Sequence, residues 1–298
     1  MTTAIVPPIE SEQAWPRLID VPAQVTAAPR LTERHPRLYP LAVRVFRAKR
    51  RWQWARSGAA WARRRVEAPS TPYRVKQHKS LLLRQLGEAE MWLQHNKVTN
   101  LRLAAQCVDG VVIRPGETFS FNRVVGNCTK RRGFVTGMKL SNGAANAGVG
   151  GGICQLANLL AWMFMHSDLT MVERSEHSFD PFPDNGRVLP WGVGCSIVYN
   201  YVDLMVRNDT DATFVLSVGV GERYLEGEIR TDTEPTLAYS VEARDEQFLR
   251  HNGRVFRRNQ IWRAVRDRRT GSWLRDELLK RNCALVTYSP DESVVIDV

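Results

Sequence analysis

The run Gly148-Val-Gly-Gly-Gly-Ile-Cys154-Gln155 decides how the centre of this chain folds. Four glycines stand within five residues, and glycine leaves the backbone free to turn. Apolar residues at helical spacing follow directly: Leu156, Leu159, Leu160, Met163 and Phe164. This spacing is typical of a buried helix. The run therefore predicts a glycine-rich loop that delivers Cys154 to the first turn of such a helix.

A cysteine at the start of a helix suits nucleophilic chemistry. The first turn leaves backbone N–H groups unpaired and carries a partial positive charge, which can lower a cysteine pKa from about 8.5 into the range of roughly 3.5 to 7.5. The same amides can stabilise an oxyanion during acyl transfer. The alternative is that Cys154 is a small buried residue beside a tight turn, because free cysteine is often buried. The residues alone leave both interpretations open.

Around this centre the chain divides by composition. Residues 1–30 are rich in Pro and Ala without a period, which indicates a poorly ordered arm. Residues 31–72 hold a basic helix and a proline-containing linker. Residues 73–235 are expected to form the core domain, and residues 236–298 a β-rich extension.

The stretch from Leu41 to Val66 contains no acidic residue. Apolar residues recur at steps of three and four: Leu41, Val45, Ala48, Trp52, Ala55 and Ala59. Such spacing predicts an amphipathic helix whose other faces are cationic. The helix either packs on the domain with a solvated basic face, or binds an anionic membrane surface, or binds nucleic acid. Of these partners, nucleic acid is the least expected.

Hydrophobic patterning elsewhere predicts an α+β fold with a mixed, largely antiparallel sheet. A second helix is expected over Lys79–Leu93. Short strands are expected at Leu101–Ala105, Gly110–Ile113, Thr118–Asn122, Leu169–Arg174, Cys195–Asn208 and Thr213–Gly221. Hairpins are expected around residues 114–117 and 208–211. Strand-like pieces continue to the end of the chain.

Length and composition exclude several classes. The 298 residues are 43% hydrophobic and 24% charged, as in a globular protein. No apolar stretch reaches the roughly 18 residues of a membrane-spanning helix, and the first thirty residues do not resemble an export signal. The five cysteines form no C-x-x-C pair, which favours a reducing compartment over disulfides or structural zinc. We therefore expect a cytoplasmic protein, with the basic helix as a peripheral anchor on the inner membrane face, and no metal or cofactor.

A cysteine nucleophile needs a base, and His177 is the best candidate because it follows a predicted strand in a proline-flanked loop. Asp203 is a candidate to orient that base, because a charge among the apolar residues of a strand calls for a partner.

Four blocks of sequence, in order, resemble the VanW family. They are Arg114-Pro-Gly-Glu-Thr-Phe-Ser-Phe121, Gly150-Gly-Gly-Ile-Cys-Gln155, His177-Ser-Phe-Asp-Pro-Phe-Pro-Asp-Asn-Gly-Arg187, and Tyr201-Val-Asp-Leu204 followed by Arg207-Asn208. The resemblance runs from about Leu31 to near the C-terminus. It implies a role in glycopeptide resistance and peptidoglycan metabolism, and some exported proteins with this domain resemble cysteine L,D-transpeptidases.

By this resemblance, Cys154 would attack a peptidoglycan stem peptide with His177 as base and Asp203 as orienting group. Further residues would line the substrate site: Gly150, Gly151, Gly152, Gln155, Glu117, Ser120 and Asn122. The alternative is a non-catalytic accessory module that binds a wall precursor or a partner protein at the membrane surface.

Overall fold

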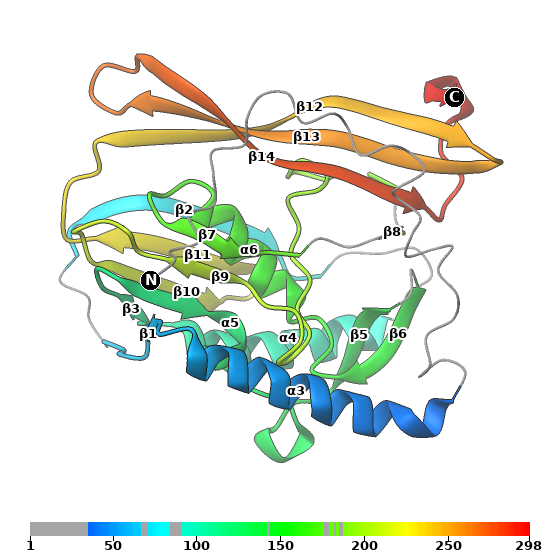
Figure 1. Cartoon of the computed structure of the whole chain (residues 1–298), viewed down its shortest axis with the longest axis horizontal. Helices are drawn as coiled ribbons and strands as arrows, with labels where there is room; N and C mark the ends of the chain where they lie inside the picture. Colours follow the sequence, from blue (N-terminus) through cyan, green and yellow to red (C-terminus); the bar gives the residue numbers. More distant parts are fainter. Residues whose placement is uncertain are drawn as a thin grey trace.

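The structure is a computed structural model that describes residues 35–66, 71–83, 91–141, 144–175, 179–181, 183–184 and 187–298. Its helices and strands form an α+β fold with mixed, largely antiparallel sheets, so the predicted fold class is confirmed. Figure 1 shows a long C-terminal sheet at one side of the molecule, the other sheets and α6 in the middle, and α3 along the opposite side.

The central sheet carries the helix that begins with Cys154. Its strands are β2 (Tyr73–Leu81), β11 (Tyr224–Thr231), β10 (Phe214–Val220) and β3 (Val112–Ile113), antiparallel in that order. Helices α4 (Met91–Val108) and α6 (Cys154–Phe164) contact this sheet and each other. At Gly227, an added Cβ would lie 2.6 Å from Leu159 of α6. The missing side chain therefore lets α6 pack directly on the backbone of β11.

A smaller sheet and a hairpin complete the middle of the molecule. The sheet orders β1 (Ala60–Trp61), β4 (Glu117–Ser120), β9 (Met205–Arg207) and β7 (Thr170–Glu173). The short helix α5 (Phe121–Val125) follows β4, and the hairpin β5 (Thr136–Ser141) and β6 (Ala144–Val149) leads to the glycine-rich loop. Phe119 of β4 and Phe164 of α6 pack with ring centroids 5.6 Å apart, which joins this sheet to the core.

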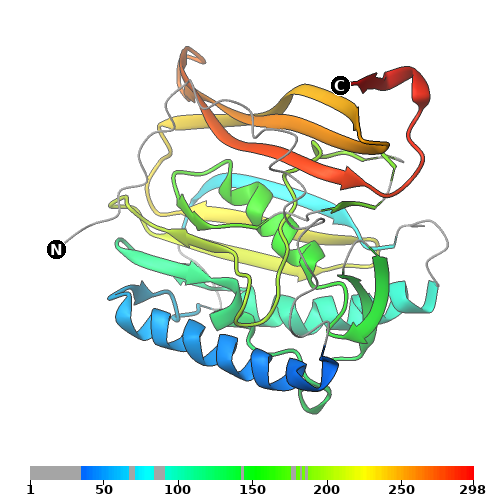
Figure 2. The same cartoon turned by 45° about the vertical axis from the view of Figure 1, so that its right-hand side comes forward.

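The C-terminal sheet forms an outer layer. It orders β15 (Val295–Asp297), β12 (Leu237–His251), β13 (Arg254–Asp267), β14 (Trp273–Val286) and β8 (Phe179–Asp180). The 3-10 helix η3 (Glu292–Val294) precedes β15. Ile261 of β13 packs in one buried cluster with Trp162 and Met165 at the end of α6. Figure 2 shows the same layer above α6. The proposed boundary at residue 235 stays a prediction.

The basic helix is shorter than predicted. After η1 (Pro36–Leu38), α3 runs over Tyr39–Arg56 and not from Leu41 to Val66. Gly58, with φ of 64°, takes the left-handed conformation that commonly ends a helix. Ala60 and Trp61 then pair with β4 as strand β1.

Other local predictions were wrong where tertiary context overrides short patterns. Leu101–Ala105 lies inside α4, and Lys79–Leu81, expected in a helix, ends strand β2. Apolar runs of four or five residues do not distinguish a strand from a turn of buried helix. Neither expected hairpin forms, because β3 and β10 belong to the central sheet whereas β4 and β9 belong to the smaller one. Of the long strand expected over Cys195–Asn208, only β9 is a strand.

Arg257 of β13 binds carboxylates on β8, on the chain just after β8, and on the neighbouring strand β12. Its side chain is only 2% exposed and meets three carboxylates: Asp180 at 3.2 Å, Glu246 at 2.6 Å, and Asp184. Its guanidinium lies 5.0 Å from the ring centroid of Trp191. Burial alone would lower the pKa of Arg257, but the hydrogen bonds to Asp184 and Glu246 raise it above its ordinary value. The arginine is therefore a fixed positive charge between two parts of the chain.

We predict that Arg257→Gln lowers the free energy of unfolding by about 3 kcal/mol, because it leaves the buried Asp180 carboxylate without the Arg257 cation. Urea denaturation followed by tryptophan fluorescence measures the change. Arg254→Gln, at an exposed position of the same strand, is the control and should stay within about 0.5 kcal/mol of wild type. Equal losses in the two variants would contradict a specific role for the Arg257 cluster.

Candidate functional site

The glycine-rich loop is held by close backbone contacts. Gly150 and Gly152 have φ of 75° and 93°, a region that favours glycine. A Cβ on Gly151 would lie 2.2 Å from the carbonyl carbon and oxygen of Gly137 in β5. A Cβ on Gly152 would lie 2.1 Å from the side chain of Lys97. These glycines therefore serve close approach to β5 and α4, in addition to the turn that the sequence predicted.

A buried asparagine of α4 holds the loop in place. Asn100 Nδ2 donates to the carbonyl of Gly151 at 2.9 Å and to the carbonyl of Val135 at 3.0 Å. Its Oδ1 accepts from the Val135 amide at 2.9 Å. One turn earlier, Asn96 Nδ2 donates to the carbonyl of Thr136 at 2.8 Å. Two asparagines on one helix face thus bind both the glycine loop and the start of β5.

The start of α6 uses more of its amides than predicted. The Gln155 amide donates to the carbonyl of Gly152 at 3.1 Å, and the amides of Leu156 and Ala157 donate to the carbonyl of Ile153 at 3.0 and 3.3 Å. A short turn therefore precedes the helix and satisfies these donors internally. The expectation that several first-turn amides are free for an oxyanion is wrong for residues 155–157.

Cys154 is the first residue of α6 and is partly exposed. Burial of its thiol raises the pKa above the ordinary cysteine value, whereas a hydrogen bond from the Ile197 amide, the charge of Lys139 and a bond from its own amide act in the opposite direction. The net shift is upward, so the predicted lowering of the Cys154 pKa by the helix N-terminus is wrong. The resting site holds a protonated thiol with a backbone donor beside it.

Two further cysteines, Cys128 and Cys195, lie near Cys154. Cys128 packs against the glycine loop, since a Cβ on Gly150 would lie 2.5 Å from the Cys128 Cβ. Burial raises the pKa of Cys128 to about 11 and that of Cys195 further still. All five cysteines are free thiols. The charge of a Cys154 thiolate would act on both neighbours, so the site is a cluster of protonated thiols.

Asp203, Ser120 and Asn122 are brought together by the structure. Ser120 Oγ donates to the Asp203 carboxylate at 2.5 Å, and the Asn122 amide donates to it at 2.9 Å. The Asn122 side chain donates to the carbonyl of Val202 at 2.9 Å. The carboxylate thus anchors the start of α5. Ser120 and Asn122, expected to line a substrate site, and Asp203, expected to orient the base, bond chiefly to one another and to nearby backbone.

The Asp203 carboxylate has no exposure to solvent, although it lies in a loop and not on the strand that the sequence predicted. Burial raises its pKa to about 6, against the opposing hydrogen bonds from Ser120 and Asn122. The charge of Glu173 contributes to the rise. Glu173 in turn accepts from the Asp203 amide at 3.0 Å and forms a two-pronged ion pair with Arg50 of α3 at 2.6 and 2.8 Å.

The remaining predicted site residues have different surroundings. Gln155 Nε2 donates to Ser80 Oγ at 2.9 Å and to the carbonyl of Leu81 at 2.8 Å, so this side chain ties α6 to β2. The Glu117 carboxylate accepts from the Arg114 amide at 2.9 Å and closes its own turn. His177 lies outside the described residues.

Sequence reasoning missed two residues that position the site. Asn100 holds the glycine loop, and Asn158 Oδ1 of α6 accepts from the Cys195 amide at 2.6 Å. Through Asn158, the helix fixes the segment whose Ile197 amide reaches the thiol. A buried polar residue in a helix has no sequence pattern of its own. An asparagine among the apolar positions of a helix was the available signal.

The fold and the site define an α+β protein built around a cysteine at the start of a buried helix. A family model described as "VanW like protein" matches residues 96–230. The Vancomycin B-type resistance protein VanW of Enterococcus faecalis (strain ATCC 700802 / V583) is 34% identical over 271 residues, which are 90% of this chain and 97% of that protein. The chain therefore belongs to the VanW family, as its motifs predicted.

A second relative matches part of the chain. The uncharacterised protein YoaR of Bacillus subtilis (strain 168) is 32% identical over 138 residues, which are 43% of this chain and 46% of YoaR. No solved structure matches the chain.

We predict that native Cys154 reacts slowly with iodoacetamide. Because its pKa is raised, the thiolate fraction at about pH 8 should be lower than in the unfolded chain, and the alkylation rate should fall roughly tenfold or more. Peptide mass mapping of native and urea-unfolded protein measures both rates. Faster alkylation of Cys154 in the native protein than in the unfolded chain would instead support the low pKa predicted from the sequence.

The buried Asp203 predicts an unusual pH dependence of stability. A carboxyl whose folded pKa is raised to about 6 stabilises the fold fully below its unfolded pKa of about 3.9 and loses this contribution as the pH rises through about 6. Between about pH 4 and about pH 7, the free energy of unfolding of the wild type should fall by roughly 2 kcal/mol relative to that of Asp203→Asn. Urea unfolding at several pH values tests this. Asp209→Asn, at a carboxyl whose pKa is lowered beside Arg207, is the control and should not show this loss.

Proposed function

We propose that the protein acts in glycopeptide resistance by modifying peptidoglycan peptides, with Cys154 as the nucleophile of an acyl transfer. The similarity to the E. faecalis vancomycin resistance protein supports the biological role. The observation that carries the chemistry is the position of Cys154 as the first residue of α6, where its buried thiol receives a hydrogen bond from the Ile197 amide. A backbone donor at the sulfur favours the thiolate as it forms.

In this reaction the Cys154 sulfur attacks the carbonyl that follows the L-centre of diaminopimelate in a stem tetrapeptide. The C–N bond to the terminal D-Ala breaks, and D-Ala leaves as the amine after taking up the proton that the thiol gave to the base. The stem remains as a thioester on Cys154. The amine of a second stem then attacks the thioester carbonyl, and the thiol is released.

Because the resting thiol is protonated, the reaction needs a base at the moment of attack. His177 is proposed for this role, and chain connectivity supports it. The Ser196 amide donates to the carbonyl of Ser175 at 2.7 Å, and the next residue, Ile197, bonds the Cys154 sulfur. His177 follows Ser175 by two residues, a span of at most roughly 7 Å. Asp203 is proposed to act on the histidine from the same segment.

A second function has an observation in its favour. Burial raises the Cys154 pKa, and Ser120, Asn122 and Asp203 use their hydrogen bonds internally. These features suit a non-catalytic module that recognises a wall precursor or a partner protein. Such a module needs no thiolate and forms no covalent intermediate.

Intact-mass spectrometry after incubation with tetrapeptide muropeptides separates the two functions. The acyltransferase should gain the mass of a stem lacking D-Ala, and Cys154→Ser should abolish this thioester. Cys283→Ser, on the distant strand β14, should retain it and serves as the matched control. His177→Ala should slow adduct formation by a factor of about 10² to 10⁴.

Calorimetry with the same muropeptides completes the test, after thermal unfolding shows that each variant is folded. A wild-type protein that binds the peptides without any adduct, and binds equally after Cys154→Ser, is the accessory module. Absence of both adduct and binding contradicts both proposals.

A further inference from the structure

The apolar face that the sequence assigned to α3 points away from the protein. Leu41, Val45 and Trp52 are 59%, 58% and 58% exposed, and Ala48 and Ala55 of the same row are also exposed. Leu38, just before the helix, continues the same row. We name these six residues the α3 stripe. Burying the stripe on the domain was one of the sequence interpretations, and the exposure of these side chains contradicts it.

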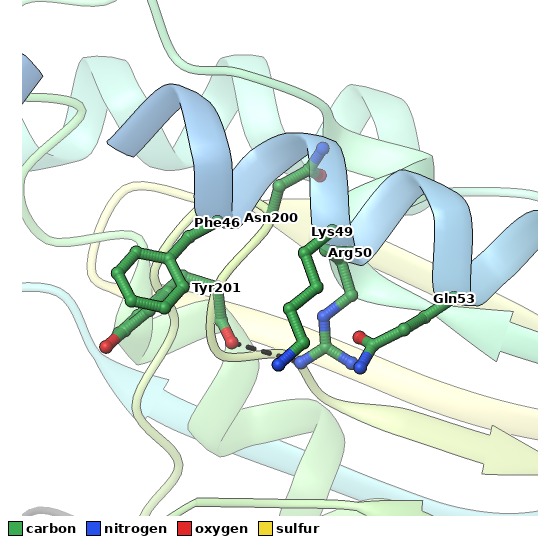
Figure 3. Close-up of a pocket in the computed structure, with 6 residues that line it drawn as sticks. All are labelled: Phe46, Lys49, Arg50, Gln53, Asn200 and Tyr201. Atoms are coloured by element: carbon green, nitrogen blue, oxygen red, sulfur yellow. Dashed lines mark hydrogen bonds between the residues drawn. The ribbon is translucent and has the colours of Figure 1, made fainter. Parts of the chain in front are cut away.

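A different face of α3 fixes the helix to the core. Trp54 is buried and meets Trp61 edge-on with ring centroids 6.1 Å apart. Arg47 lies over the ring of Tyr199 at 5.1 Å, and Arg50 is paired with Glu173. Figure 3 shows Phe46 and Tyr201 on one side of a pocket of about 270 Å³, with the side chains of Lys49, Arg50 and Gln53 extending from the helix on the other. The helix is therefore already attached, whereas its stripe stays exposed, with the Arg56 guanidinium of the same helix 4.8 Å from the centroid of the Trp52 ring.

Cations flank the α3 stripe. The helix contains no acidic residue, and four of its cations are exposed: Arg44, Lys49, Arg51 and Arg56. None of the four forms an ion pair with another residue of the described ranges. The turn that contains η2 (Lys130–Arg132) projects on the same side of the molecule beyond α3, and Figures 1 and 2 agree on this. Positive charge thus surrounds an exposed apolar row.

We propose that the α3 stripe docks on an anionic membrane surface. A helix lies in the interface of a bilayer when large apolar side chains, with tryptophan among them, enter the acyl boundary and Lys or Arg side chains meet anionic headgroups. The exposed surface of α3 combines an apolar row that includes Trp52 with the flanking cations, which matches this requirement. Nucleic acid explains the cations but not the apolar row, and a protein partner explains the row but not the excess of unpaired cations. No helix of the described residues is long and apolar enough to span a bilayer.

Docking would orient the candidate site. Arg50 donates to the carbonyl of Tyr201 at 3.0 Å as well as to Glu173, so α3 holds the segment that leads to Asp203. The same stretch of chain supplies the Ile197 amide to Cys154. The C-terminal sheet lies on the side opposite α3 (Figure 2) and would face away from the membrane. This inference stands whether or not Cys154 is catalytic.

Vesicle sedimentation of the full chain tests the proposal. The wild type should bind vesicles of equimolar phosphatidylglycerol and phosphatidylcholine at low ionic strength and should not bind pure phosphatidylcholine. Arg44→Glu/Arg51→Glu should weaken binding about thirtyfold or more, the product of two headgroup contacts. Trp52→Ser should weaken binding and remove the quenching of tryptophan fluorescence by brominated lipid.

Matched controls lie at the far side of the molecule. Trp273→Ser changes a tryptophan that is equally exposed, at 58%, and Arg269→Glu reverses an exposed charge. Both variants should bind vesicles like the wild type. The proposal is overturned if the wild type does not bind anionic vesicles or if the controls weaken binding as much as the α3 variants. It is also overturned if the α3 variants instead abolish binding of duplex DNA or convert a dimer into a monomer while vesicle binding is unchanged.

Discussion

The contact between the backbones of Gly151 and Gly137, fixed by the buried Asn100 side chain, is the constraint on which the rest of the site depends. It sets where the glycine loop ends and therefore where α6 begins. From that start, α6 lies against β11 at Gly227 and holds the Cys195 amide through Asn158. A side chain at Gly151 would separate β5 from the loop and displace the helix. These glycines therefore fix the position of the loop and of the start of α6 through close contacts, more than they make the loop flexible.

Two effects compete at Cys154, and their magnitudes decide the outcome. A helix N-terminus stabilises a negative charge by about 0.3 to 1 kcal/mol, and rarely by about 2 kcal/mol. Removing an ion from water costs several kcal/mol per charge. Because the amides of residues 155–157 are already bonded to the carbonyls of Gly152 and Ile153, the thiol is favoured as an anion by the Ile197 amide, the Lys139 charge and its own amide. Burial therefore prevails, and any nucleophilic chemistry has to couple deprotonation to the attack itself.

The sequence predicted those features that repeat along the chain. The loop, the apolar helix after Cys154 and the strand at β10 follow from composition and periodicity, and the fold class follows from their mixture. Short apolar runs such as Leu101–Ala105 fit helix and strand equally. The sequence left open whether the apolar face of α3 packs on the domain, because Arg47 and Arg50 face inward only through Tyr199 and Glu173, which are distant in sequence. Cys154 and Asp203 had local signals. The positioning asparagines, Asn100 and Asn158, had only the weaker signal of a polar residue among the apolar positions of a helix.

Arg50 also determines how the buried carboxyl of Asp203 behaves. Glu173 lies close enough to raise the Asp203 pKa, and two adjacent anions in a buried place would be unfavourable without a cation. Arg50 supplies that cation from α3, and the Glu173 carboxylate also accepts a hydrogen bond from the Asp203 amide. If α3 moved outward, Glu173 would lose its partner and its unscreened charge would raise the Asp203 pKa further. The helix that presents the exposed stripe is thus also the helix that supplies the cation beside the candidate site.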